Sequence, residues 1–256
     1  MLSKVELLDV MGDDLAVVNA ARVSFNKESD WDTATHYSFD PDANGGMGGH
    51  DEIPVEQLSL RDANLIKYLA DHNHWSPFAH CFLKFRVTCP IPMSIHLMKH
   101  TVGLNINSES RRYVSYTPEI YEPLQWRGKA KDKKQGSSSE IITLPKECVY
   151  EEQDDLDVYQ HSVAVAVDAY TRMLELGVCE EQARFVLPQG AMVTFIWSGS
   201  LAAFLRVVQL RTSSDAQQET ADVARQIESH IRGLFPVSYS AYFDEGRGSA
   251  IPRDGH

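Results

Sequence analysis

Positive charge is the minority in this sequence of 256 residues. Its 36 acidic side chains outnumber the 24 Lys and Arg side chains, which gives a formal net charge of −12. A protein that binds nucleic acid in general needs a basic surface, so we expect no nucleic-acid polymer as a partner. An anionic small molecule is not excluded, because a local cationic pocket can lie within an acidic protein.

Long apolar runs are also missing. No stretch approaches the roughly 18 apolar residues of a membrane-spanning helix, although 43% of the residues are hydrophobic, as in ordinary globular domains. The first residues, Met1–Lys4, lack the apolar segment of a secretory signal. We therefore expect no membrane partner and a cytoplasmic location, or the host cytoplasm for a viral protein.

Cysteine is scarce, and its spacing favours no metal site. No C-x-x-C pair occurs, and no histidine pair stands at zinc-ligand spacing beside a cysteine. Without a secretory signal, reduced thiols that are mostly buried and inert are the default. The four cysteines are Cys81, Cys89, Cys148 and Cys179.

The sequence contains no dinucleotide-binding fingerprint. The Gly-rich stretch within residues 40–49 lacks both G-x-G-x-x-G and G-K-[ST], and no apolar helix follows it directly. We predict surface-loop insertions at about 26–56 and 126–140. The second insertion is rich in lysine, but it has no interleaved aromatic residues, which favours a solvated loop over a nucleic-acid tract.

Hydrophobic periodicity predicts a single α+β domain over residues 1–256, with a mixed sheet and long C-terminal helices. Apolar and polar residues alternate over residues 83–89, as in a half-buried strand. Asp13 or Asp14 and Ser59 are typical N-caps of two early helices. Further helices are predicted at about 93–100, 152–177, 179–187, 199–211 and 215–234.

Polar residues that could carry chemistry concentrate in short segments. His74–His80 follows a predicted helix, and Lys99–Tyr113 combines cations with hydroxyls and amides. Such a segment suits a phosphate, because Lys and Arg supply charge while hydroxyls and backbone N–H groups supply directed donors. A lone arginine is more often a solvated or ion-paired residue, so the spacing alone predicts only a protein that binds a phosphorylated ligand.

Several segments, in the same order along the chain, resemble flavin-dependent thymidylate synthases. The resemblance covers essentially the whole chain outside the two insertions. Its motifs are Val5–Leu15, A-A-R-V-S-F at Ala20–Phe25, H-x-S-P-F at His74–Phe78, the helix into Lys99–His100, N-x-x-S-R-R-Y ending at Tyr113, Ala183–Pro188, and Leu210–Arg211 with Ala216–Glu219.

The resemblance implies conversion of dUMP to dTMP. Family members take the one-carbon unit from 5,10-methylenetetrahydrofolate and a hydride from reduced FAD, which NADPH regenerates. They are homotetramers that hold flavin and nucleotide where subunits meet. This arrangement accounts for an implied FAD in a sequence without a Rossmann fingerprint.

The resemblance also implies site residues. Arg211 matches the catalytic arginine at the uracil edge, where a guanidinium is a preorganised partner for developing negative charge. Arg206, one helix turn beyond Ala202, where the family often has arginine, is expected near the cofactor. The remaining cofactor positions are Ser24, Ser76, Lys99 and His100. The substrate positions are Lys99, Ser110, Arg111, Arg112, Arg184 and Arg211, with Ser110 not expected to be a covalent nucleophile.

Departures from the family pattern leave alternatives open. Lys99-His100-Thr101 stands where many members have R-H-R, and Ser108 stands where glutamate is usual. These changes suggest a divergent branch, with a viral source as one option. The alternative functions are C5-methylation or hydroxymethylation of another pyrimidine nucleotide (UMP or dCMP), and a non-catalytic nucleotide-binding or RNA-binding relic. A cysteine nucleophile at Cys89 is the rival mechanism, and we expect instead that Cys89 packs in the core.

Overall fold

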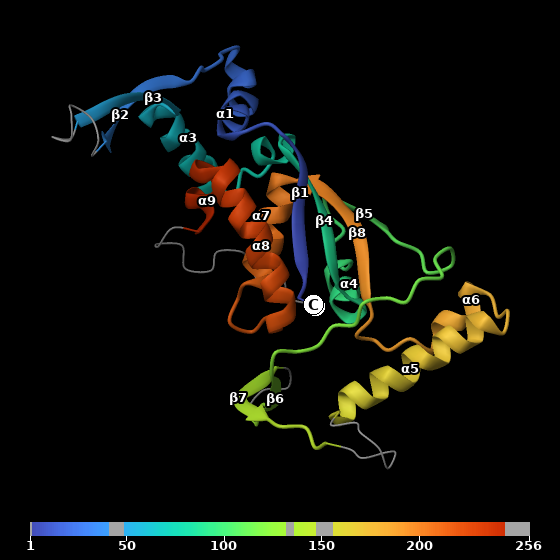
Figure 1. Ribbon diagram of the computed structural model, residues 1–256. Helices are drawn as coiled ribbons and strands as arrows, with labels where there is room; N and C mark the ends of the chain where they lie inside the picture. The colour runs from blue at the N-terminus through green and yellow to red at the C-terminus, as the bar shows by residue number, and fades with distance from the viewer. Residues whose placement is uncertain (1, 41–48, 132–135, 147–155, 244–256) are drawn as a thin grey trace. The chain divides into compact units, whose positions relative to one another are not determined.

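The computed structural model describes residues 2–40, 49–131, 136–146 and 156–243, and its contacts group into two compact units (Figure 1). The first unit comprises Met1–Asp9, Lys84–Gly199 and Arg206–Glu228. The second comprises Val10–Leu83, Ser200–Leu205 and Ser229–His256. The mixed α/β class predicted from the sequence is confirmed, while a single domain over the whole chain stays a prediction.

A four-stranded sheet, most of whose residues belong to the first unit, has the strand order β1-β4-β8-β5. Its strands are β1 (Lys4–Met11), β4 (Phe82–Pro90), β5 (Leu104–Ser108) and β8 (Met192–Ser200). In β4 the alternate residues Leu83, Phe85, Val87 and Cys89 are buried, as the period of two predicts. The aromatic residues of β8, including the fully buried Trp197, supply the other large part of this core.

Strand β5 approaches β8 closely enough to require glycine. The two strands are antiparallel, with Leu104 opposite Gly199. A Cβ atom at Gly199 would lie 2.3 Å from the carbonyl oxygen of Gly103, which itself has a φ of 73°. Glycine tolerates both the contact and the left-handed backbone, so this pair holds the loop after Lys99–His100 against the sheet.

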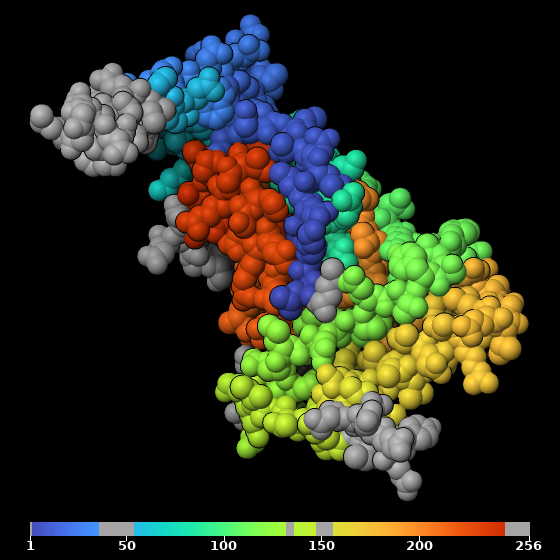
Figure 2. Space-filling view, in the orientation of Figure 1, coloured from blue at the N-terminus to red at the C-terminus, as the bar shows by residue number. Residues whose placement is uncertain are grey.

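The helices follow the predicted C-terminal pattern, with shorter bounds. Asp157 and Gln160 form a capping box at the start of α5. Gln226 of α8 accepts a hydrogen bond from the backbone N–H of Val5 in β1 at 2.9 Å, which attaches this helix to the edge strand. In Figure 2 the blue surface of β1 lies beside the orange-red surface of α8. The helices are α4 (Ile91–Leu97), α5 (Val158–Glu175), α6 (Glu180–Ala183) with the 3₁₀ turn η3 (Arg184–Val186), α7 (Leu201–Arg211) and α8 (Gln218–Leu234).

Helices and a two-stranded ribbon build the second unit. Asp13 caps α1 (Asp14–Arg22) and Ser59 caps α3 (Leu60–Asp71), as predicted. Helix α3 packs against α9 (Pro236–Phe243). The buried Asp14 carboxylate accepts hydrogen bonds from the backbone N–H groups of Val237 and Ser238, which ties α1 to the start of α9. The short 3₁₀ turns η1 (Val23–Phe25) and η2 (Pro77–His80) complete the unit.

Both predicted loop insertions contain paired strands, so the expectation of plain loops is wrong. Strands β2 (Asp32–Asp40) and β3 (Gly49–Gln57) pair antiparallel in the second unit. Strands β6 (Trp126–Lys129) and β7 (Ser137–Ile142) do the same in the first. Their polar composition conceals the period-two pattern, because a ribbon of two strands needs no buried apolar face to complete its hydrogen-bond ladder.

No helix in the described part of the chain combines the length and hydropathy that crossing a membrane requires.

Candidate functional site

Arg211, the last residue of α7, contacts His100 in the loop after α4. The Arg211 Nε–H donates to Nε2 of His100 at 2.8 Å. Burial, followed by the positive charges of Arg211, His96 and Arg206, lowers the pKa of His100 to about 4. His100 is therefore neutral near pH 7, and its Nε2 acts as the acceptor that orients the guanidinium group.

His96 lies one helix turn before His100 and belongs to the same group. Its Nδ1 contacts the hydroxyl of Thr220 at 3.2 Å, and that hydroxyl donates to the sulfur of Met93. Burial lowers the pKa of His96, and the charges of Arg211 and Lys99 lower it further. We call His96, Lys99, His100, Arg206 and Arg211 the Arg211 cluster.

The Arg211 cluster contains three cationic side chains, Lys99, Arg206 and Arg211. In the ranges that the structure describes, no carboxylate forms an ion pair with Lys99, Arg206 or Arg211. Arg211 is half-buried, whereas Lys99 and Arg206 are exposed. A half-buried guanidinium with directed N–H donors and exposed cations near it favours an anionic ligand. The structure thus brings together four residues that the sequence singled out, namely Lys99, His100, Arg206 and Arg211.

A cavity of about 840 Å³ opens beside Arg211 and His96. Its volume falls within the usual range for small-molecule sites. The wall includes the carboxyl group of Asp215 and, in larger number, guanidinium and hydroxyl groups, which are donors for phosphate or another polar anion. These groups belong to Arg127, Ser137, Ser138, Ser139, Arg211, Thr212, Ser213, Ser214 and Arg225.

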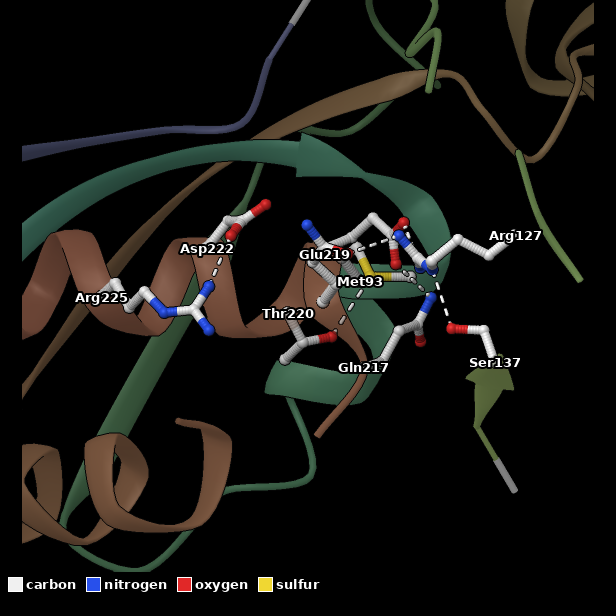
Figure 3. A network of polar contacts seen from close by, with 9 residues as sticks. Met93, Arg127, Ser137, Gln217, Glu219, Thr220, Asp222 and Arg225 are labelled. Carbon is white, nitrogen blue, oxygen red and sulfur yellow. Dashed lines mark hydrogen bonds and ion pairs between the residues drawn. The ribbon is translucent and has the colours of Figure 1, made fainter. Parts of the chain in front are cut away.

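Arg127 of β6 is a residue of this wall that the sequence reasoning missed. Its guanidinium donates to Glu219 at 2.7 Å, to Gln218 at 2.9 Å and to Ser137 at 2.8 Å (Figure 3). The sequence signal is weak, because Arg127 lies in a lysine-rich insertion and its acidic partner is 92 residues away. Only its place beside the apolar Trp126 sets it apart from the lysines that follow.

The predicted phosphate loop forms a second group, also in the first unit. Arg112 makes an ion pair with Glu181 at 3.3 Å, and Arg184 donates to the backbone carbonyl of the same Glu181 at 3.1 Å. The Ser110 hydroxyl accepts from the Arg112 N–H at 3.4 Å. Arg111 donates to the Tyr116 carbonyl at 2.7 Å, with its guanidinium 4.5 Å from the centre of the Tyr116 ring.

These residues, Ser110, Arg111, Arg112, Glu181 and Arg184, are the Arg112 cluster. The loop that follows β5 and the turn formed by α6 and η3 position them. No hydrogen bond or ion pair between described residues joins the Arg112 cluster to the Arg211 cluster. The structure therefore assembles the predicted residues of the first unit into two groups rather than one.

The remaining predicted residues, Ser24 and Ser76, lie in the second unit. Both are exposed: Ser24 in η1, and Ser76 just before η2, whose N-terminus its side chain does not cap. Ser24 lies in sequence between wall residues of a cavity of about 410 Å³. That wall includes the cations Arg22, Lys27 and Arg61, of which Arg22 also makes an ion pair with Asp62.

The donor chemistry fits a flavin nucleotide and gives no support to a metal. Cations without carboxylate partners, cavity-lining hydroxyls and exposed serines match the phosphates and polar ring edge of such a cofactor. Across residues 2–40, 49–131, 136–146 and 156–243, no group of three or more His, Cys, Asp or Glu side chains could hold a metal ion.

The described cysteines differ in exposure. Cys81 and Cys89 are buried, and burial raises the pKa of each thiol to about 12, so neither is a thiolate near neutral pH. This agrees with the expectation that Cys89 packs in the core. Cys179 is exposed, which corrects the default of a buried thiol there, and Cys148 lies outside the described residues.

Known proteins resemble this chain along almost its whole length. The model of the family described as "Thymidylate synthase complementing protein" matches residues 6–237. A flavin-dependent thymidylate synthase from Kosmotoga olearia is 30% identical over 245 residues, which cover 94% of this chain and 90% of the relative. One from Thermosipho africanus is 30% identical over 236 residues, covering 92% and 89%.

Solved structures show the same likeness. A UMP/dUMP methylase, PolB from Streptomyces cacaoi, bound with 5-Br dUMP, superposes with a TM-score of 0.68 at 31% identity and 94% coverage of both chains. The same methylase bound with 5-Br UMP superposes with a TM-score of 0.67 at 27% identity, covering 94% of this chain and 93% of that one.

Proposed function

Because the chain belongs to the flavin-dependent thymidylate synthase family, we propose that it methylates dUMP reductively to dTMP. The proposed carbon donor is 5,10-methylenetetrahydrofolate, the proposed cofactor is FAD, and NADPH is the proposed reductant. The observation that carries the proposal is the Arg211 cluster. Its guanidinium group is held by a neutral histidine and has no carboxylate partner among the described residues.

Arg211 is the proposed catalytic residue. Its Nε–H is engaged by His100, which leaves the two terminal nitrogens to face the uracil edge of dUMP. A positive group that is already oriented stabilises negative charge that develops on the ring as the carbon unit is transferred. Since His100 is neutral, it orients Arg211 without adding a second charge that would repel it.

The Arg112 cluster is the proposed phosphate site. Ser110, Arg111, Arg112 and Arg184 supply hydroxyl and guanidinium donors, and Lys99 adds charge from the other cluster. Arg112 is about half exposed, with 48% of its side chain accessible. Exchange of its Glu181 partner for a phosphate costs little, because exposed ion pairs contribute only about 0–1 kcal/mol.

The residues proposed to contact the flavin are Ser24, Ser76, Lys99, His100 and Arg206. When bound, reduced FAD supplies the hydride that converts the transferred carbon unit into a methyl group. Ser24 and Ser76 of the second unit would hold it through their exposed hydroxyls. Lys99, His100 and Arg206 of the first unit would hold it through charge and hydrogen bonds, and they keep the site positive for an anionic cofactor.

We propose that the chain forms a homotetramer, as its resemblance to the family implies. The Arg211 and Arg112 clusters share no hydrogen bond or ion pair within the described residues, which supports a site completed by groups from another copy. Exposed apolar side chains such as Val23, Phe25 and Phe185 are consistent with further burial on assembly.

Anaerobic turnover tests the proposed function. Flavin-loaded protein is mixed with dUMP, methylenetetrahydrofolate and NADPH, and the nucleotide product is identified by mass spectrometry. We expect dTMP, in which a methyl group replaces the C5 hydrogen of dUMP, so that the product is heavier by one CH2. Unchanged dUMP from protein that binds flavin and dUMP would refute the proposal and would favour a non-catalytic nucleotide-binding protein.

UMP is a second candidate substrate, and the solved methylase structures favour it. PolB is named as a UMP/dUMP methylase and is 31% identical to this chain. The same assay therefore includes UMP and dCMP in parallel at equal concentrations. A kcat/KM for UMP that equals or exceeds that for dUMP would make the ribonucleotide the substrate and would replace the dTMP assignment.

A further inference from the structure

The guanidinium of Arg127 is fully engaged by other elements of the first unit. Nε donates to the Ser137 hydroxyl of the paired strand β7, while Nη1 and Nη2 donate to Gln218 and Glu219 at the start of α8. Only 19% of the Arg127 side chain and 13% of the Glu219 side chain are accessible. The contact thus joins the β6–β7 ribbon to α8 through a largely desolvated, charge-assisted pair.

Glu219 is also held by Gln217, the residue just before α8. Gln217 donates to its second carboxylate oxygen at 3.0 Å, so both oxygens are occupied. Burial alone would raise the pKa of Glu219, but hydrogen bonds from its backbone N–H, Arg127 and Gln217 hold that pKa below its usual value. Figure 3 shows the Arg127 side chain reaching toward Glu219, with Ser137 of β7 close to its guanidinium group.

The next residue connects this contact to the Arg211 cluster. Thr220 is fully buried and touches both His96 and Met93 of α4. The start of α8 is therefore attached on one side to the ribbon, through Glu219, and on the other side to α4, through Thr220. Between Arg211 and this anchored turn runs the short segment 212–217, which lines the cavity.

We propose that Arg127 is a positioning residue for the catalytic segment. Its hydrogen bonds to Gln218 and Glu219 fix the start of α8. They thereby fix the conformation of residues 212–217 and the orientation of the Arg211 side chain. The β6–β7 ribbon is then a clamp on the cavity wall rather than a solvated appendage. This inference rests on the proposed function, because the effect on turnover requires that Arg211 act on the substrate.

Kinetics of four variants test the clamp. Arg127→Gln removes the positive charge, whereas Arg127→Lys keeps the charge but lacks the planar set of guanidinium donors. Glu219→Gln removes the negative charge of the acceptor. The double variant Arg127→Gln/Glu219→Gln completes a double-mutant cycle, which measures the coupling between the two side chains. For Arg127→Gln we expect kcat to fall about 10- to 100-fold, the size expected when a catalytic group is misplaced, with a smaller change in KM for dUMP. Arg127→Lys should recover part of kcat, and the double variant should be no worse than the poorer single variant.

Hydrogen–deuterium exchange of the purified full chain gives a readout independent of turnover. We expect Arg127→Gln to speed exchange in peptides that cover residues 212–221 and to leave β4 peptides unchanged. The matched control is Arg86→Gln, which breaks the exposed Arg86–Glu6 ion pair of the same unit. This control should alter neither exchange nor kcat.

The outcomes separate this inference from the proposed function. Wild-type protein that forms no methylated nucleotide refutes the proposed function, whereas the exchange comparison still tests the clamp. An active wild type together with normal kcat and normal exchange in Arg127→Gln overturns the clamp. Faster exchange throughout the sheet, with kcat lost in proportion to folded protein, also overturns it, because Arg127 would then be a stability residue only.

Discussion

The two arginine clusters of the first unit differ in what holds their guanidinium groups. In the Arg211 cluster a neutral imidazole accepts from Arg211, and no carboxylate within the described ranges makes an ion pair with the cluster. In the Arg112 cluster a carboxylate, Glu181, occupies Arg112, and the Tyr116 carbonyl occupies Arg111. His100 orients the Arg211 guanidinium, which makes no ion pair with a described carboxylate. Glu181, by contrast, already neutralises part of the charge of the Arg112 cluster.

This contrast distinguishes two tasks for a positive charge. A group that must stabilise charge during a reaction works best when it is oriented beforehand and has no competing anion. A group that captures a phosphate can exchange one anion for another, since an exposed ion pair is weak. Arg211 has the first arrangement and Arg112 the second, which supports the catalytic and binding roles proposed for them.

The largest effect is expected at Arg211. Arg211→Ala should lower kcat for dTMP formation by at least about 100- to 1,000-fold, the cost of losing one preorganised donor to developing charge. Flavin binding, measured from the absorbance spectrum, should change little. Arg211→Lys is the matched variant, because it keeps the charge but cannot donate to His100 from the same fork. A normal kcat in Arg211→Ala would refute the catalytic role of Arg211, and with it the proposed difference between the two clusters.

A smaller effect is expected at Arg112. Arg112→Ala should weaken dUMP binding about tenfold, because a hydrogen bond to a charged group is worth about 1.5–3 kcal/mol and Glu181 already offsets part of it. Titration of the flavin spectrum with dUMP measures the dissociation constant. Glu181→Gln should tighten binding, since it removes the competing carboxylate. An unchanged dissociation constant in both variants would exclude a phosphate role for this pair.

The smallest effect concerns pH and the folded state. The pKa of His100 is about 4 in the folded protein and about 6.5 when unfolded, so the unfolded chain binds more protons between those values. The free energy of unfolding should therefore fall as pH falls through that window. His100→Gln keeps an acceptor but does not titrate. It should reduce the loss of unfolding free energy between pH 7 and pH 5 by about 1 kcal/mol, once solvent screening of this half-buried group is taken into account.

Urea unfolding of ligand-free protein at the two pH values measures that difference. The pKa of His96 is shifted in the same direction, so part of the pH dependence should persist in His100→Gln. An identical pH dependence in wild type and variant would mean that His100 titrates normally. That result would contradict the inference that His100 is a neutral acceptor for Arg211.

Local patterns were enough to predict much of the fold. The period of two in β4 follows from a strand with one buried face, and the Asp13 and Ser59 caps follow from side-chain acceptors before apolar helices. The β2–β3 and β6–β7 ribbons were missed because their pairing lies in the backbone, and their side chains carry no strong hydrophobic alternation. Resemblance supplied the candidate residues, while their grouping into clusters required the structure.

What the sequence determined by itself was the alternating strand β4, the early helix caps, the helical C-terminal half, the family motifs and the supply of cations within an acidic chain. Only the tertiary structure decided which cations are neutralised. His100 meets Arg211 across 111 residues, and Arg127 meets Glu219 across 92. Such contacts depend on how strands and helices pack, and no short-range pattern encodes them. The same packing removes water from His100, which keeps it neutral beside the positive charge of Arg211.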